Sequence, residues 1–246
     1  MRVKKLVVLL FASLLLSGCG KTNVDCFSDP GEVISEFRTF DSIFTGINMF
    51  DNVNVEMVSS NEAKVEVIAG DKLLDGVVTE VIDGELIIRN NNQCSFLRQS
   101  ERYFKVIVYY TQLDSITYRS VGDLTAMSII KSDTFKVNIF EGAGTINLRL
   151  DCSKSYLNYH FGTASLNVEG ISNVNYIYQV SYGSVNALNL LTTYTYLENR
   201  SPNHCYVNAS STLEATINGK GNVYYKGNPS EITRLGAGSG ELLPWQ

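Results

Sequence analysis

The sequence predicts an all-β protein whose second half forms a parallel β-helix. Three observations support this fold class: short runs of alternating apolar and polar residues, a repeat of about twenty residues from residue 113 onward, and an unusual composition. Only 18% of the 246 residues are charged and 44% are hydrophobic, so the chain can fill a core while Tyr, Asn, Ser and Thr replace charge. This composition is typical of sheet-rich proteins outside the cytoplasm.

The first residues have the features of a secretory signal. A basic start is followed by an apolar run from Leu6 to Leu16, which is too short to span a bilayer as a helix. The motif Leu16-Ser17-Gly18-Cys19 is typical of a bacterial lipobox. We therefore expect residues 1–18 to be a signal peptide and Cys19 to carry lipid, palmitate included. Gly20 stands where an inner-membrane retention signal favours Asp, which favours an outer-membrane lipoprotein on either face, the cell surface included.

The charge of the mature chain argues against a nucleic-acid partner. Residues 19–246 contain 17 Lys and Arg against 25 Asp and Glu. A nucleic-acid-binding surface needs clustered cations that displace counterions, and a polybasic membrane patch needs the same residues. The predicted contact with the membrane is therefore the lipid anchor.

The first half of the mature chain is predicted to hold separate strands rather than repeats. Residues 19–36 are polar and irregular, and we interpret them as a lipidated tether. Asp83-Gly84 between two alternating runs predicts a two-residue hairpin, and residues 71–76 predict a helical turn. The predicted strands are residues 40–45, 52–58, 64–68, 77–82, 85–89 and 103–110. Because no Pro, Gly or Ser-rich linker follows, residues 37–243 are predicted to be one domain.

The second half contains six phrases that each begin at a turn residue. These anchors are Gly122, Gly144, Gly162, Gly183, Asn203 and Gly221. Two positions later the residues are Leu124, Ile146, Ala164, Val185, Cys205 and Val223. Four positions later they are Ala126, Leu148, Leu166, Ala187, Val207 and Tyr225. Both columns are almost wholly apolar and the position between them is polar or amphipathic, so one side of each strand is expected to be buried.

The constant register favours parallel stacking, in which each coil pairs its backbone with the next. An antiparallel meander or sandwich is the alternative, because short alternating strands at this spacing occur there as well. In a β-helix, Cys152 and Cys205 lie two to three coils apart, beyond disulfide reach. The four remaining cysteines allow three pairings, and the one disulfide that we consider is Cys26 with Cys94, bonded or not.

Several motifs point to one family of proteins. They are the lipobox, Phe40-Asp-Ser-Ile43, Gly84-Glu-Leu-Ile-Ile88, Gly122-Asp-Leu124 and the run Ile217-Asn-Gly-Lys-Gly-Asn-Val-Tyr-Tyr-Lys-Gly-Asn-Pro229. Together they resemble the "putative auto-transporter adhesin, head GIN domain" family of exported bacterial proteins, common in Bacteroidetes. The resemblance covers about residues 37–243. It implies a right-handed β-helix with additional N-terminal strands and an envelope location, and it assigns no site residue.

No arrangement in the sequence points to catalysis or to a metal. The two histidines, His160 and His204, lie in different repeats. β-helical enzymes that cleave polysaccharides need clustered carboxylates or a basic residue on one strand face. The acids of the repeats recur at no common register; they are Asp123, Glu141, Asp151, Glu169, Glu198 and Glu214. We therefore predict a protein without catalytic residues, metal or cofactor.

The tyrosines are the unusual surface feature, since all fourteen lie between Tyr103 and Tyr225. Tyr176 and Tyr178 place two rings on one face of a strand, and Tyr194 and Tyr196 do the same 18 residues later, about one coil. Such rings suit flat sugar faces, so these four are the candidate ligand-binding residues. The alternative is that half-buried tyrosines pack on one another in strands.

Taken together, the sequence predicts a lipid-anchored module of the cell envelope for binding or adhesion, with a glycan or another cell-surface molecule as partner. Two alternatives from other classes remain. One is a carbohydrate-active β-helix enzyme, and the other is a purely structural envelope protein. Adhesion predicts binding without turnover, the enzyme predicts product release, and the structural protein predicts neither.

Overall fold

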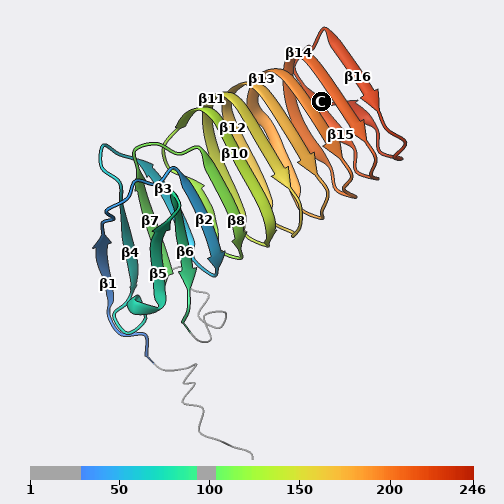
Figure 1. Ribbon diagram of the computed structural model, residues 1–246. Coiled ribbons are helices and arrows are strands. Elements are labelled where there is room, and N and C mark those ends of the chain that lie inside the picture. Colours follow the sequence, from blue (N-terminus) through green and yellow to red (C-terminus); the bar gives the residue numbers. More distant parts are fainter. Residues whose placement is uncertain (1–28, 93–103) are drawn as a thin grey trace, which may run out of the picture.

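The computed structural model describes residues 29–92 and 104–246 (Figure 1). Cys19, Cys26 and Cys94 lie outside the described residues, and so do the predicted lipidation site and the Cys26–Cys94 pairing. No helix in the described part of the chain is long and apolar enough to cross a membrane. The elements are β1 (Val33–Arg38), β2 (Gly46–Asp51), β3 (Asn54–Ser59), β4 (Lys64–Gly70), the 3-10 turn η1 (Leu74–Gly76), β5 (Val77–Ile82), β6 (Glu85–Asn90), β7 (Phe104–Tyr110), β8 (Ser115–Ser120), β9 (Leu124–Ala126), β10 (Ile130–Gly142), β11 (Thr145–Tyr159), β12 (Ser165–Gln179), β13 (Ser184–Asn199), β14 (Cys205–Ile217), β15 (Val223–Lys226), β16 (Glu231–Leu235) and β17 (Leu242–Pro244).

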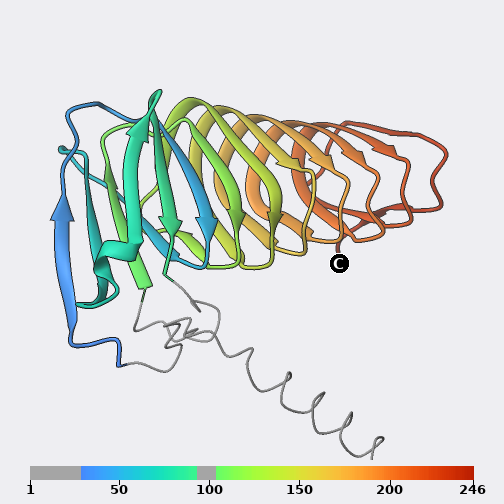
Figure 2. The same ribbon diagram turned by 60° about the horizontal axis from the view of Figure 1, so that its bottom comes forward.

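The second half of the chain is a parallel β-solenoid. Strands β8, β10, β11, β12, β13 and β14 pair in this order, and every pair is parallel. Between β11 and β12 the register runs from Thr145 opposite Ser165 to Tyr159 opposite Gln179. Figure 1 and Figure 2 show the coils following one another along one axis. The predicted parallel β-helix is therefore confirmed, and the antiparallel meander or sandwich is excluded.

The long strands bend, so that their two halves lie on two faces of the solenoid with the core between them. In β11, Ile146 and Leu148 are buried before the bend, whereas Leu157 and Tyr159 are buried after it. The inward side therefore changes from even to odd residue numbers at the corner near residue 153. We call the face formed by residues 145–149 and their equivalents the Asn face, and the face formed by residues 154–159 and their equivalents the Tyr face.

One of the six predicted repeat anchors is wrong by two residues. Leu166, not Ala164, is the partner of Ile146. Gly162 lies next to Gly142, the first of two glycines in the preceding turn, and an ideally placed Cβ on Gly162 would be 2.7 Å from the Gly142 oxygen. The sequence pattern does not tell which of those two glycines Gly162 matches. Because the error is an even number of residues, both predicted columns remain apolar.

The N-terminal strands extend both faces of the solenoid. On the Asn face, β3 lies between β9 and β7 in parallel pairing. On the Tyr face, β2 lies between β8 and β6, again in parallel. Antiparallel strands complete this end, because β4 and then β1 follow β7 while β5 follows β6. The predicted extra strands therefore share one hydrophobic core with the coils.

Two predicted boundaries in this half differ from the structure. Residues 40–45 are not a strand, because Phe44 turns into the core and β2 starts only after this segment. The predicted tether of residues 19–36 overlaps β1, which begins at Val33. As an edge strand β1 has exposed residues on both sides, so it shows no apolar alternation in the sequence. The predicted hairpin is confirmed, with Asp83 and Gly84 at φ of 51° and 79°.

An arginine lies over the core at each end of the solenoid. Arg38 in β1 donates to Leu74 O at 3.2 Å. Arg234 in β16 donates to the carbonyl oxygens of Gly238 at 2.7 Å and Gly240 at 3.1 Å. In the strand register, both arginines lie opposite residues of the neighbouring strand whose side chains point inward. Each guanidinium group therefore satisfies backbone carbonyls at a place where the next coil would otherwise stack.

The two described cysteines are free thiols, as the sequence predicted for this pair. Cys205 is fully buried in the core column between Val185 and Val223. Cys152 is buried near the corner of β11, in a different column. Their separation follows from the stacking of coils, which keeps residues of different columns and coils apart.

Iodoacetamide at pH 8 is expected to leave Cys205 unmodified in the folded protein. Burial disfavours the thiolate and raises the pKa of Cys205 to about 12, and the thiolate is the form that reacts. Burial also raises the pKa of Cys152. Peptide mass mapping after alkylation with and without denaturant measures the difference. Equal labelling of Cys205 in both conditions would contradict its place in the core.

Candidate functional site

The Tyr face carries stacked aromatic rings that we call the tyrosine ladder, formed by Tyr156, Tyr176 and Tyr196. Successive members pair in register, one coil apart. The ring centroids of Tyr156 and Tyr176 are 4.9 Å apart, and those of Tyr176 and Tyr196 are 5.4 Å apart, with interplanar angles of 11° and 20°. Lys136 Nζ lies 5.9 Å from the ring centroid of Tyr156. Stacked rings on neighbouring strands stabilise a sheet surface.

The four tyrosines that were predicted to bind ligand do not lie in one column. Tyr176 and Tyr196 share a column, because coils on this face repeat after 20 residues rather than the predicted 18. Tyr178 and Tyr194 instead pair with non-aromatic residues of the neighbouring coil. Tyr176 and Tyr194 are 37% exposed, and the other two are half-buried. Their role in ligand binding stays a prediction.

Stacking limits what the tyrosine ladder presents to a partner. In a face-to-face stack each ring covers the flat face of its neighbour, so ring edges and hydroxyl groups point outward. A sugar that stacks on an aromatic residue needs a free ring face, where its apolar side meets the π-system. The geometry of the tyrosine ladder therefore suits support of the sheet and hydrogen bonding better than sugar stacking.

At the edge of the Tyr face, three aromatic rings lie between two arginines. The guanidinium carbon of Arg119 lies 4.3 Å from the centroid of Phe140, and Phe140 stacks on His160 at 4.6 Å. His160 contacts Tyr178 at 5.6 Å, and Arg200 lies 5.8 Å from the Tyr178 centroid. Burial lowers the pKa of His160, which favours the neutral imidazole that stacks here. Both His160 and Tyr178 thus have packing partners on the surface.

Several acids of the repeats are engaged with neighbouring groups. Glu169 pairs with Arg149 at 2.7 Å, and Glu198 pairs with Arg200 at 2.7 Å. Asp123 Oδ1 accepts a hydrogen bond from a backbone nitrogen of β11 at 2.7 Å. Within residues 29–92 and 104–246, no three His, Cys, Asp or Glu side chains come together as a metal site requires.

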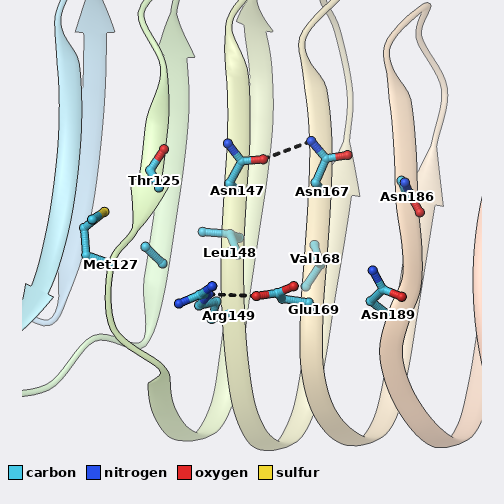
Figure 3. A pocket seen from close by; sticks show the side chains of 11 residues that line it. Thr125, Met127, Asn147, Leu148, Arg149, Asn167, Val168, Glu169, Asn186 and Asn189 are labelled. Atoms are coloured by element: carbon cyan, nitrogen blue, oxygen red, sulfur yellow. Dashed lines mark hydrogen bonds and ion pairs between the residues drawn. The ribbon is translucent and has the colours of Figure 1, made fainter.

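The Asn face carries an open depression, the asparagine trough, with a volume of about 340 Å³ (Figure 3). Its floor is an outward column in which Asn147, Asn167 and Asn186 follow one another in register. Asn167 Nδ2 donates to Asn147 Oδ1 at 3.0 Å. The next column holds the ion pair of Arg149 with Glu169. The outward side chains that line the asparagine trough are Thr125, Met127, Asn147, Arg149, Asn167, Glu169, Asn186 and Asn189, and the buried residues Ala126, Leu148 and Val168 lie beneath them.

Aromatic residues close the C-terminal end of the asparagine trough. An adjoining depression of about 550 Å³ shares Asn167 and Asn186 with it and is bounded by Tyr206 and Trp245. Tyr206 stacks on Tyr224 with centroids 5.3 Å apart, and the Trp245 ring stands perpendicular to both, at 5.3 and 5.8 Å. The backbone nitrogen of Trp245 donates to a carbonyl oxygen of β15 at 2.7 Å, which fixes the position of this residue.

Sequence reasoning misses the asparagine trough for a specific reason. With the anchor placed at Gly162, the outward column contains Ser165 instead of Asn167, and the run of asparagines is interrupted. The true register makes Asn147, Asn167 and Asn186 direct neighbours. Asparagines separated by 20 and 19 residues were the available signal.

Comparisons with known proteins agree with this fold. A family model described as "Putative auto-transporter adhesin, head GIN domain" matches residues 43–229. The solved structure of a putative adhesin from Bacteroides fragilis has a TM-score of 0.77 at 19% identity, over 87% of this chain and 97% of that chain. No curated protein matches the sequence.

Two proteins of Parabacteroides distasonis are similar to this chain in the same way. One is a putative adhesin, with a TM-score of 0.65 at 18% identity over 87% of this chain and 98% of that chain. The other is a putative lipid binding protein, with a TM-score of 0.64 at 19% identity over 88% of this chain and 98% of that chain. At these identities the structures show a common fold, and the family model covers most of the sequence. This chain therefore belongs to the head GIN domain family of putative auto-transporter adhesins.

Proposed function

We propose that this protein is a lipid-anchored adhesion module of the outer membrane that binds carbohydrate on the outside of its solenoid and leaves it intact. One observation carries the proposal: outward amide and aromatic side chains recur at one-coil spacing on both faces. Coils lie about 4.8 Å apart, so a repeating polymer meets the same kinds of side chain at regular intervals. Membership of an adhesin family supports a binding role.

The ion pairs of Glu169 and Glu198 support binding without turnover. Glycoside cleavage uses two carboxyl groups that flank the scissile bond, one as acid and the other as base or nucleophile. Glu169 and Glu198 lie on different faces of the solenoid, and each is held in an ion pair. These two carboxylates cannot flank one ligand, because Glu169 lies on the Asn face and Glu198 lies on the Tyr face.

Replacing Cys19 with alanine is expected to release the protein from the membrane fraction or to stall its processing, because acylation requires the thiol. Cell fractionation followed by immunoblotting measures the partition, with Cys152→Ser as a matched cysteine control that should remain membrane-bound. A Cys19→Ala protein that partitions into the membrane like the wild type would refute the lipid anchor.

Attachment of whole cells tests the adhesive role. Cells that produce the wild-type protein should attach to carbohydrate-coated surfaces more than cells that lack it. The soluble chain from residue 20 onward should compete for this attachment, because it carries the solenoid without the lipid. Equal attachment by both kinds of cell on every coating would contradict the proposal.

A further inference from the structure

We infer that the asparagine trough, rather than the tyrosine ladder, binds the ligand, and that the ligand is a neutral oligosaccharide lying along the solenoid axis. The inference rests on the proposed carbohydrate-binding function and assigns it a place and a ligand class. Four features of the asparagine trough lead to it: its polar floor, its balanced charge, its aromatic end and its direction.

The floor of the asparagine trough offers both donors and acceptors to a ligand. Asn147 and Asn167 use one amide atom each for their mutual hydrogen bond of 3.0 Å. Among the described residues, Asn147 Nδ2 and Asn167 Oδ1 have no hydrogen-bond partner, so both atoms are available to a ligand. Asn186 and Asn189 are exposed at the same surface. Amide groups both donate and accept, which suits the hydroxyl groups of a sugar.

The charge of the asparagine trough favours a neutral ligand. Its two charged side chains, Arg149 and Glu169, neutralise each other in an ion pair of 2.7 Å (Figure 3). A polyanionic glycan needs unpaired cations that replace its counterions. The mature chain has eight more acidic than basic residues, so its overall field also repels an anionic polymer.

The aromatic end supplies the apolar contact that the tyrosine ladder lacks. Trp245 is 47% exposed and stands perpendicular to Tyr206 and Tyr224, so its ring is not covered by a parallel neighbour. It borders the same depression as Asn167 and Asn186. A large indole beside a polar floor gives a sugar unit both an apolar face and hydrogen bonds.

The direction of the asparagine trough suits a chain of several sugar units. Its column crosses neighbouring strands and therefore runs along the solenoid axis, from Thr125 through the three asparagines to Tyr206. With coils about 4.8 Å apart, four steps between five residues span roughly 19 Å. A single monosaccharide would fill only part of this length, so affinity is expected to rise with the number of units.

The test is a binding titration of the mature chain against soluble gluco-, manno- and galacto-oligosaccharides of one to six units and against uronic-acid-containing ones of equal length. The trough variant is Asn147→Ala/Asn167→Ala. Its matched control is Asn138→Ala/Asn158→Ala, which removes the equivalent asparagine pair on the Tyr face, joined by a bond of 3.1 Å. Two further variants are Trp245→Ala and the ladder variant Tyr176→Ala/Tyr196→Ala, which removes two stacked members of the tyrosine ladder. Thermal melts establish that each variant is folded.

We expect at least one neutral series to bind, with affinity rising with length. The trough variant and Trp245→Ala should each lose about tenfold or more in affinity, while the matched control and the ladder variant bind like the wild type. Loss confined to the ladder variant would overturn the inference and leave the proposed function standing. Preference for uronic-acid-containing oligosaccharides, or no binding to any member of the panel, would also overturn it. Equal attachment of cells with and without the protein would instead contradict the proposed function itself.

Discussion

Replacing Leu166 with aspartate is expected to destabilise the protein by about 4 kcal/mol or more. Leu166 is fully buried and lies between Ile146 and Val185 in the core column of the Asn face. The substitution removes a large apolar side chain and places an unpaired charge between two coils. For a domain of this size, the expected fall in Tm is roughly 8–16 °C.

Ser165→Asp is the matched control for this substitution. Ser165 precedes Leu166 on the same strand, but its side chain lies on the outside of the solenoid. A charge there remains in water, so the change in Tm should be small. Thermal unfolding followed by circular dichroism measures both variants. If Leu166→Asp melted within a degree or so of the wild type, the column would face solvent and the register would be wrong.

Replacing Gly170 with alanine is expected to cost roughly 2–6 kcal/mol. Gly170 has φ of +111°, which L-residues rarely adopt, and lies opposite Leu150, where β12 leaves the Asn face. An ideally placed Cβ would lie 2.0 Å from Leu150 O in the preceding coil. The alanine would therefore suffer both backbone strain and steric overlap with Leu150 O. The overlap can be relieved only if the two coils move apart.

Gly84→Ala separates these two contributions. Gly84 has φ of +79° in the hairpin between β5 and β6, and nothing lies within 4 Å of an added Cβ. This variant should show backbone strain alone, at about 1–2 kcal/mol. Chemical denaturation measures both changes in the free energy of unfolding. Equal losses for Gly84→Ala and Gly170→Ala would contradict the close stacking of coils at Gly170.

The solenoid was predictable because its signal is local and repeated. Each phrase places two apolar residues two positions apart, so a column such as Val185, Cys205 and Val223 can be read without knowing the fold. The bend inside each long strand was not predictable. It reverses the inward side near residue 153, and this reversal depends on how the second half packs across the core. The edge strand β1 was missed because pairing on one side only buries little apolar surface.

The candidate site was harder to predict than the fold because it depends on register. A shift of two residues keeps the core columns apolar but changes which polar residues are neighbours. With that shift, Asn167 leaves the column between Asn147 and Asn186, and the asparagine trough is hidden. Trp245 could not be placed either, since its contacts with Tyr206 and Tyr224 arise from packing of the last strands. The tyrosines were predicted as ligand-binding residues because the sequence shows the type of side chain. It does not show that neighbouring rings cover each other's flat faces.

A crystal structure of the mature chain with the tightest-binding oligosaccharide of the panel tests the central claim most directly. The account predicts an intact oligosaccharide lying along the asparagine trough, hydrogen-bonded to Asn147 and Asn167 and in contact with the Trp245 ring. An oligosaccharide bound over the tyrosine ladder would contradict the assigned site. A shortened product in the crystal, also detected by mass spectrometry of the soaking solution, would contradict binding without turnover.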